Sequence, residues 1–476
     1  MNMKHKNFSF YEFMRHTPHE QTVIRFVQQT LIIIIMVLSI SIYGCNGNSI
    51  NTESGFSEDI SETVSDTASE EVTEQSEEPD ESLELYNFII NKWRECDTKP
   101  IYEYLHADLK AILAKNDFVY ILEYISYIGG DLLNSDITEK ATENDRDTYY
   151  TQIEFENVTV DFTLAIKDNE IIAIYRNVFF KEEFEIKISE NITERYFVLE
   201  NEGYMLNAVY TYVNDGKDNP TVLFISGSGL CDYNETVGLL TPFEDVASEF
   251  AKKGINSLRI DKRTLNYGNY FATTDGIEEE YLSDCKAALQ YIAAQNSGGK
   301  IYLLGHSLGG QIASVIASED NEISGMILFN SSARNLADIM YDQYSIIDPA
   351  NEAIYDMYRK SAKNADDNTV EGLNYYGVSD YYWASLNKIN VIENIKASGI
   401  PVLIINSTFD NQVFEADISL WLENFTDDNK VIVYIDDQIS HFGYEIDTRD
   451  QNTLYKRVSF PERILNKFTN FISDER

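Results

Sequence analysis

Short apolar runs alternate with stretches of helical spacing through the second half of the chain. The runs predict buried strands at 221–225, 255–260, 301–304, 326–330, 401–406 and 431–435. The intervening and closing stretches predict helices at 243–253, 279–295, 311–318 and 460–472. Strands that alternate with helices in this way favour a mainly parallel sheet covered on both faces, the α/β class. Two amphipathic strands at 196–200 and 205–213 come before this alternation.

A different pattern occupies residues 83–180. Leu85, Phe88, Ile89 and Trp93 recur at helical spacing, and 118–128 is a second apolar helical stretch. Residues 158–166 then alternate with period two, and the Asp168-Asn169 turn leads to 171–175, which predicts a hairpin. Helices followed by antiparallel strands indicate a small α+β domain. It resembles the cone-shaped nuclear-transport-factor-like modules that precede hydrolase domains in some secreted bacterial proteins, and we interpret its His106 as structural.

Charge changes the picture of the segment that comes before this domain. The chain has 476 residues, with 37 Lys and Arg against 79 Asp and Glu, a net charge of −42. Residues 53–81 hold twelve acidic residues and no basic ones, so 46–82 is predicted to be a disordered acidic linker. The length allows two or three domains, and 43% apolar residues support sizeable cores. This charge balance argues against nucleic acid as a partner, because phosphate binding needs basic patches.

Residues 1–45 have the pattern of a targeting segment. Basic residues come first, and the apolar run 31–44 is too short for a comfortable membrane span. The run ends in Ile42-Tyr-Gly-Cys45, which resembles the bacterial lipobox and predicts lipidation of Cys45. A simple N-terminal anchor helix is the alternative. Both interpretations give the protein a membrane partner and place the rest of the chain outside the cytoplasm.

The remaining cysteines add little to this picture. Cys96, Cys231 and Cys285 form an odd set without C-x-x-C spacing, so they predict neither a metal site nor a disulfide framework. Cys285 falls on the apolar face of a predicted helix and is interpreted as a core residue.

The stretch 301–310 carries the strongest candidate for chemistry. The apolar run ends at Gly305, Ser307 follows, and Gly309 opens a helical segment, which gives the pattern G-x-S-x-G. In a sharp strand-to-helix turn a side chain at either glycine would block the crossing of strand and helix, and Ser307 would stand at the apex as a nucleophile. A chance match in a Gly/Ser turn is the alternative. With its strand and helix, the stretch resembles the nucleophile elbow of the α/β-hydrolase superfamily.

The resemblance implies an acid and a histidine downstream of Ser307. Of the six histidines only His441 lies there, just after the predicted strand 431–435. Asp410 follows the predicted strand 401–406, in a run that resembles the acid loop of the family, with Ser407 in place of its opening glycine. Its role would be to orient His441. Glu415 and Asp338 are the alternative acids.

An oxyanion hole is also implied by the resemblance. The loop Ser226-Gly-Ser-Gly-Leu230 follows strand 221–225 and is similar to the His-Gly-x-Gly loop of the family, with Ser226 in the histidine position. Ser228 would supply one backbone N–H and Leu308 the other. A phosphate-binding loop is the alternative, but the Lys-Ser/Thr pair that follows such loops is absent.

The resemblance covers 181–476, including Asp261-Lys-Arg263 after the fourth predicted strand. It implies a lid at about 331–397, which is rich in aromatic residues. The expected protein is thus a serine hydrolase that cleaves small carboxylic esters without metal or organic cofactor. A serine peptidase or a thioesterase/acyltransferase of the same fold remains an alternative, as does a binding lipoprotein with a non-catalytic hydrolase-like fold.

Overall fold

The computed structural model of the chain describes residues 80–267, 276–295, 298–365, 378–446 and 458–473. Their contacts divide them into two compact units, with the boundary along the chain between residues 182 and 183. The predicted leader, Cys45 and nearly all of the acidic linker lie outside the described residues, as do Tyr375 and Tyr376 of the predicted lid. In the described ranges, no helix combines the length and the apolar character that a membrane crossing needs.

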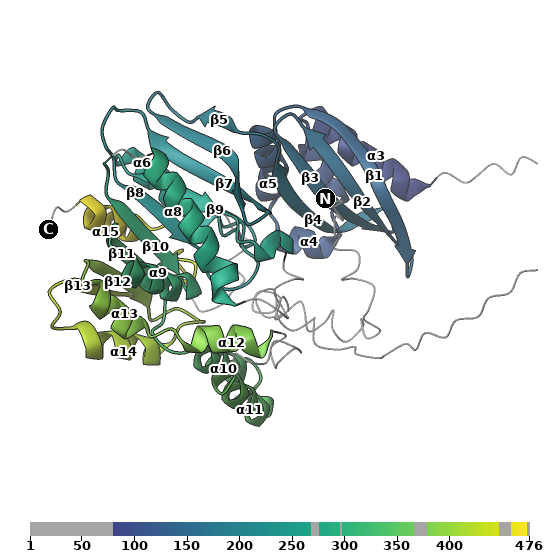
Figure 1. Cartoon of the computed structure of the whole chain (residues 1–476). Coiled ribbons are helices and arrows are strands. Elements are labelled where there is room, and N and C mark those ends of the chain that lie inside the picture. Colours follow the sequence, from purple (N-terminus) through teal and green to yellow (C-terminus); the bar gives the residue numbers. More distant parts are fainter. Residues whose placement is uncertain (1–79, 268–275, 296–297, 366–377, 447–457, 474–476) are drawn as a thin grey trace, which may run out of the picture. The chain divides into compact units, whose positions relative to one another are not determined.

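The smaller unit consists of helices followed by a four-stranded antiparallel sheet in the order β1-β2-β3-β4 (Figure 1). The helices are α3 (Glu81–Arg94), the 3₁₀ helix η2 (Lys99–Tyr104), α4 (Ala107–Ile112) and α5 (Lys115–Gly129). The strands are β1 (Leu132–Glu143), β2 (Arg146–Phe155), β3 (Val158–Lys167) and β4 (Glu170–Phe180).

Helix α3 contributes its apolar face to the core of this unit, through the buried side chains of Leu85, Tyr86, Ile89, Ile90 and Trp93. The side chain of Asp80 caps the helix by accepting a hydrogen bond from the Leu83 N–H at 3.1 Å. Trp93, at the other end, packs against Phe155 and Phe162 of the sheet, with ring centroids 5.5 and 5.4 Å apart. His106 caps α4: its Nδ1 accepts a hydrogen bond from the backbone N–H of Asp108 at 3.2 Å, which is a structural role.

The sheet of the larger unit has nine strands within the described residues, in the order β13-β12-β11-β10-β8-β9-β7-β6-β5. Strands from β13 to β9 are parallel to their neighbours, whereas β7, β6 and β5 pair antiparallel. The prediction of a mainly parallel α/β sheet is therefore confirmed. The strands are β5 (Phe184–Lys187), β6 (Ile192–Asn201), β7 (Tyr204–Val213), β8 (Thr221–Ile225), β9 (Asn256–Ile260), β10 (Ile301–His306), β11 (Ile323–Phe329), β12 (Val402–Ser407) and β13 (Val431–Asp436).

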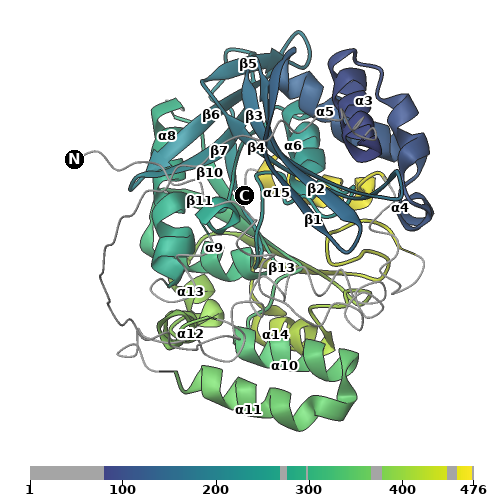
Figure 2. The same ribbon diagram turned by 90° about the vertical axis from the view of Figure 1, so that its right-hand side faces the viewer.

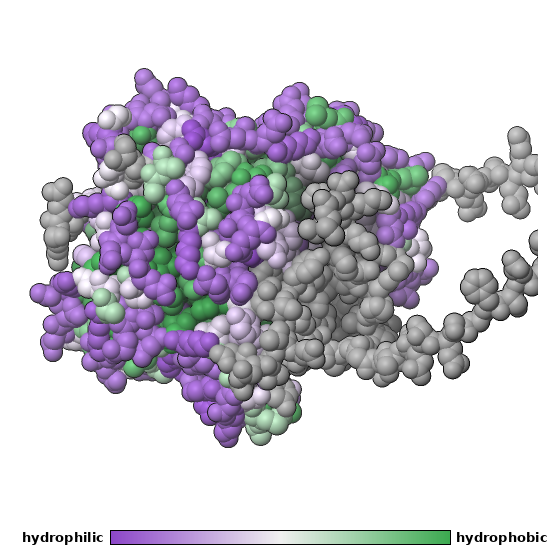
Figure 3. Space-filling model, in the orientation of Figure 1, coloured by the Kyte–Doolittle hydropathy of each residue, from purple (hydrophilic) through white to green (hydrophobic). Residues whose placement is uncertain are grey.

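Helices cover both faces of this sheet, because alternate residues of its strands point to opposite sides. Leu223 and Ile225 of β8 join a cluster with α8, α9 and α13, whereas Val222 and Phe224 join one with α6 and α15. The side of the larger unit that faces the viewer in Figure 3 shows mostly hydrophilic side chains on its helices. The covering helices are α6 (Pro242–Lys252), α8 (Ser283–Gln295), α9 (Leu308–Glu319), α13 (Val391–Ser398), α14 (Glu415–Phe425) and α15 (Glu462–Ser473).

The segment predicted as a lid contains α10 (Leu336–Ile347), η4 (Pro349–Asn351), α11 (Glu352–Lys363) and α12 (Asp380–Asn387). Helices α10 and α11 lie side by side at the edge of the larger unit (Figure 2). Tyr344 and Tyr355 stack on each other between them, with ring centroids 5.0 Å apart. Trp383 is buried in the core. Helix α13, which the prediction placed inside the lid, instead packs on α9 and belongs to the sheet covering.

Candidate active site

Ser307 occupies the sharp turn between β10 and α9. Its backbone has φ 53° and ψ −122°, a conformation that residues with a side chain seldom adopt and that tends to occur at functional sites. A Cβ on Gly305 would lie 2.3 Å from the Gly309 carbonyl oxygen, and a Cβ on Gly309 would lie 2.1 Å from the Ile225 carbonyl oxygen. Both positions therefore require glycine, for the reason the G-x-S-x-G pattern indicates.

Asp410 and His441 form a buried pair. The Nδ1 atom of His441 lies 2.8 Å from Oδ2 of Asp410, and both side chains are almost completely buried. The other carboxylate oxygen, Oδ1, accepts hydrogen bonds from the backbone N–H groups of Gln412 (2.7 Å) and Val413 (3.0 Å), which fix its orientation. With Nδ1 donating to the carboxylate, the lone pair of His441 is on Nε2. That atom is buried and has no hydrogen-bond partner within the described residues.

The histidine loop is tied to the elbow through its backbone. The carbonyl oxygen of His441 accepts from Nδ2 of Asn330 at 2.7 Å and lies 2.9 Å from Nε2 of His306, the residue before Ser307. The two imidazole rings are in contact, with centroids 4.7 Å apart. The structure thus brings Ser307, Asp410 and His441 to one place, at the carboxyl ends of β10, β12 and β13.

The two alternative acids lie elsewhere. Glu415 is exposed at the start of α14. Asp338 is on α10, where its carboxylate is 2.6 Å from Nζ of Lys363. Of the three carboxylates considered from the sequence, Asp410 is the one that contacts His441.

Ser407 joins the acid loop to the histidine loop. Its hydroxyl donates to the carbonyl oxygen of Ile439 at 2.6 Å and accepts from the Phe409 N–H at 3.0 Å. Ser407, which stands in place of the usual glycine of this loop, therefore holds the two loops together. Its partner Ile439 is two residues before His441.

The predicted oxyanion loop borders Ser307. A Cβ on Gly227 would lie 3.1 Å from the Cβ of Ser307. Ser228 follows Gly227, and Leu308 is the first residue of α9, whose leading backbone N–H groups have no partner within the helix. Both residues expected to supply N–H groups are thus at the elbow.

Glu235 anchors the oxyanion loop. The sequence had predicted that Ser226 takes the place of the histidine that begins this loop in the family. The Oε1 atom of Glu235 accepts from the Gly227 N–H at 2.7 Å and lies 2.9 Å from Nδ1 of His306. Lys262 and Tyr281 also contact this loop, by donating hydrogen bonds to the Gly227 carbonyl oxygen. None of these three residues was predicted from the sequence as a site residue. Glu235 sits in a polar stretch without periodicity, and the one available signal was the Asp261-Lys-Arg263 run.

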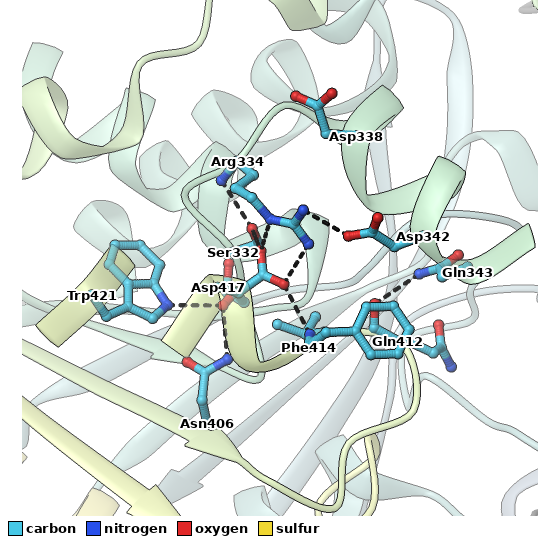
Figure 4. Close-up of polar contacts among 12 residues, drawn as sticks. Ser332, Arg334, Asp338, Asp342, Gln343, Asn406, Gln412, Phe414, Asp417 and Trp421 are labelled. Carbon is cyan, nitrogen blue, oxygen red and sulfur yellow. Dashed lines mark hydrogen bonds and ion pairs between the residues drawn. The ribbon is translucent and has the colours of Figure 1, made fainter. Parts of the chain in front are cut away.

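An ion-pair cluster fixes the start of the lid segment beside the acid loop (Figure 4). Arg334 binds both oxygens of the fully buried Asp417, with Nε–Oδ1 2.7 Å and Nη2–Oδ2 2.8 Å, and its Nη1 lies 2.7 Å from Asp342 of α10. Gln343 of α10 donates to the carbonyl oxygen of Gln412, whose N–H binds Asp410. Helix α10 and the acid loop are therefore held together.

Replacing Arg334 by methionine should lower the free energy of unfolding by about 3 kcal/mol, because it leaves the buried Asp417 carboxylate without its countercharge. Urea unfolding followed by fluorescence measures the change. Arg359→Met is the matched control, since its partner Asp356 on α11 is partly exposed and such pairs stabilise little. Equal stability of the two variants would contradict the role given to Arg334.

The cysteines of the described ranges form no disulfide with one another. Cys96, Cys231 and Cys285 are free thiols, and burial raises the pKa of Cys231 to about 12, so this thiol stays protonated. The described residues contain no cluster of three or more His, Cys, Asp or Glu side chains that could hold a metal ion.

Comparison with known proteins agrees with this fold. Residues 233–364 match the family model described as serine aminopeptidase, S33. The sheet order and the strained serine between β10 and α9 are those of an α/β-hydrolase fold, and the match lies within the larger unit.

Its relatives include enzymes described as esterases. Esterase EstD of Thermotoga maritima is 28% identical over 230 residues, which are 47% of this chain and 54% of that protein, so the chain matches about half the length of this relative. Among solved structures, ferulic acid-bound Est1E from Butyrivibrio proteoclasticus has 16% identity and a TM-score of 0.41, and covers 58% of this chain and 97% of its own. The Pyrococcus furiosus esterase Pf2001 has 16% identity and a TM-score of 0.38, and covers 62% and 98%. At these TM-scores the structural likenesses carry no argument about function.

Proposed function

We propose that the larger unit is a carboxylic ester hydrolase that works through an acyl-enzyme on Ser307. The observation that carries the proposal is the buried contact of 2.8 Å between His441 Nδ1 and Asp410, beside a serine held in a strained turn. An orienting acid, a base and a nucleophile on the ends of separate strands are the parts that this chemistry requires.

In the proposed reaction, His441 Nε2 takes the proton of the Ser307 hydroxyl as its oxygen attacks the ester carbonyl carbon. The carbonyl electron pair moves to the oxygen, and the N–H groups of Leu308 and Ser228 stabilise the resulting oxyanion. Collapse of this intermediate expels the alcohol, which receives the proton from His441. Water, activated by the same histidine, then attacks the acyl-enzyme and releases the acid.

The relative named an esterase supports a small-molecule ester as the substrate class. The proposal is tested by incubating the purified protein with a fluorophosphonate probe and with short-chain nitrophenyl esters. We expect covalent labelling at Ser307 and ester turnover, both absent in Ser307→Ala. A protein that folds but neither labels nor hydrolyses esters would favour the non-catalytic binding lipoprotein instead.

A serine peptidase is the second candidate, because the matching family model is described as a serine aminopeptidase. The same nucleophile, base and oxyanion hole can cleave an amide, so the reaction class is decided by the leaving group. Comparing kcat/KM for nitrophenyl esters with that for aminoacyl nitroanilides tests it. We expect the ester to be preferred, and a preference for the anilide would replace the esterase assignment.

We also propose that the protein is anchored to a membrane by a lipid on Cys45 and lies outside the cytoplasm. The support is in the sequence alone: a basic leader, a short apolar run and Gly44-Cys45 at its end. Lipid chains would bind the membrane by burying their methylene groups, and the acidic stretch 46–82 would extend as a tether because its charges repel one another.

Cys45→Ala should abolish lipidation and leave the protein either uncleaved or released from the membrane. Detergent partitioning and the intact mass of the cell-associated protein measure this, with Cys96→Ala, an exposed thiol, as the control. A Cys45→Ala protein with unchanged mass and unchanged partitioning into detergent would rule out the lipid anchor.

A further inference from the structure

The peptide group that joins Gly227 to Ser228 is held through its carbonyl oxygen, and the preceding peptide group is held through its N–H. The Gly227 carbonyl oxygen accepts from the Tyr281 hydroxyl at 2.6 Å and from Nζ of Lys262 at 3.3 Å. Lys262 also donates to the Gly229 carbonyl oxygen at 2.9 Å. The Gly227 N–H, which belongs to the preceding peptide group, donates to Glu235 at 2.7 Å. The three residues that hold the loop, Glu235, Lys262 and Tyr281, all lie outside it in the sequence.

Fixing that carbonyl fixes the direction of the next N–H. The peptide bond is trans and planar, so the C=O of Gly227 and the N–H of Ser228 point in opposite directions. Two donors on the carbonyl oxygen therefore aim the Ser228 N–H away from Tyr281 and Lys262. Gly227 borders Ser307, so this peptide lies where the oxyanion of the proposed reaction forms.

The two donors are buried, and Tyr281 keeps its proton. Burial, together with the nearby charge of Glu280, raises the pKa of Tyr281 well above its usual value, so its hydroxyl stays a donor. Lys262 is paired with Glu280 at 2.6 Å and lies over the Tyr281 ring, 4.3 Å from its centroid. The side chains of Lys262 and Tyr281 are thus held in place by contacts that do not involve the substrate.

Glu235 links Gly227, through His306, to the loop that carries His441. Its Oε1 faces the Gly227 N–H and Nδ1 of His306, while Nε2 of His306 faces the carbonyl oxygen of His441. Because both ring nitrogens face acceptors, the geometry favours a protonated His306. Burial lowers the pKa of His306, but the charge and hydrogen bond of Glu235 and the His441 carbonyl raise it above its usual value. Glu235 itself has φ 52°, a strained backbone that its buried contacts maintain.

We propose that Tyr281, Lys262 and Glu235 are positioning residues that aim the Ser228 N–H at the oxyanion. Tyr281 and Lys262 act through the Gly227 carbonyl, which shares a peptide group with that N–H, and Glu235 acts through the Gly227 N–H, on the preceding peptide group. The inference rests on the proposed ester hydrolysis at Ser307. An N–H aimed in advance stabilises charge that exists only in the transition state, so these residues act on kcat rather than on substrate binding.

The decisive variant is Tyr281→Phe, which removes one hydroxyl and keeps the buried ring. We expect kcat for a short nitrophenyl ester to fall about tenfold or more, with KM nearly unchanged, since loss of a whole oxyanion donor costs about 10² to 10³. Tyr302→Phe is the matched control: Tyr302 is equally buried, and its hydroxyl donates to the Ile472 carbonyl oxygen, away from the site. It should retain the wild-type kcat.

A trifluoromethyl ketone gives a second measurement. Ser307 adds to its carbonyl to form a tetrahedral oxyanion, so its affinity should weaken in Tyr281→Phe by about the same factor as kcat/KM. Glu235→Gln, which acts on the preceding peptide group, should show the same pattern. The double variant should be little worse than the poorer single one, because both changes release Gly227, whose orientation sets that of the Ser228 N–H.

The outcomes separate the inference from the proposed function. If wild type and Tyr302→Phe hydrolyse esters and Tyr281→Phe does so with the same kcat and ketone affinity, the positioning role is wrong and the esterase stands. Equal losses in Tyr281→Phe and Tyr302→Phe, in step with their melting temperatures, would likewise reduce Tyr281 to a structural residue. If folded wild type hydrolyses no ester and binds no ketone, the proposed function fails and the inference with it.

Discussion

Ser307→Ala should reduce ester turnover by about 10⁴- to 10⁶-fold, and His441→Ala by a similar factor, because nucleophile and base act as one unit. Without the hydroxyl no acyl-enzyme can form, and without the imidazole the hydroxyl keeps its proton. The double variant should be hardly worse than either single one, which is the signature of a shared step rather than of separate binding effects.

Initial rates with a short-chain nitrophenyl ester, on variants shown to be folded by circular dichroism, give the result. Ser318→Ala is the control for Ser307, since it lies on α9, the helix that follows Ser307, and its hydroxyl binds only a backbone carbonyl among the described residues. His106→Ala, in the smaller unit, is the control for His441. Full activity of Ser307→Ala would overturn the assignment of the site.

Asp410→Asn should reduce kcat by about 10⁴-fold while leaving the fold intact, because an amide nitrogen facing His441 Nδ1 selects the wrong tautomer. The native carboxylate accepts the Nδ1 hydrogen at 2.8 Å and is itself held by two backbone N–H groups. In the variant, Nδ1 becomes an acceptor and Nε2 carries the hydrogen, so the base that Ser307 needs is lost.

The kcat of Asp410→Asn, compared with that of Glu415→Gln, measures this effect. Glu415 is exposed on α14 and should be replaceable without loss. Loss of activity in Glu415→Gln together with an active Asp410→Asn would move the acid and leave the nucleophile and base in place.

The larger sheet could be predicted from the sequence because its central strands are buried on both faces. Such strands consist of continuous apolar residues, as at Thr221–Ile225, where the predicted and observed bounds coincide. The smaller unit was harder for the opposite reason. Strands β1 and β2 were not predicted, since β1 is exposed along most of its length and its polar residues carry no burial pattern.

The elbow could also be predicted, because its sequence pattern is local. Gly305, Ser307 and Gly309 lie within one turn of chain. The limit on Gly305 arises from the crossing of β10 and α9, whereas the limit on Gly309 comes from the backbone at the end of the neighbouring strand β8. The positions of Asp410 and His441 after predicted strands followed from the rule that the carboxyl ends of parallel strands meet at one edge.

The choice of partners was decided by the tertiary structure. The loop resemblance favoured Asp410 over Glu415, and the fold decided between them. Asp410 contacts His441, whereas Glu415 is exposed at the start of α14. Glu235 and His306 are 71 residues apart and become neighbours only when β8 and β10 pair. The sequence by itself therefore determined the sheet, the turn and the candidate nucleophile. Only folding decided which distant side chains hold the oxyanion loop and the histidine, because those contacts depend on strand pairing and not on spacing along the chain.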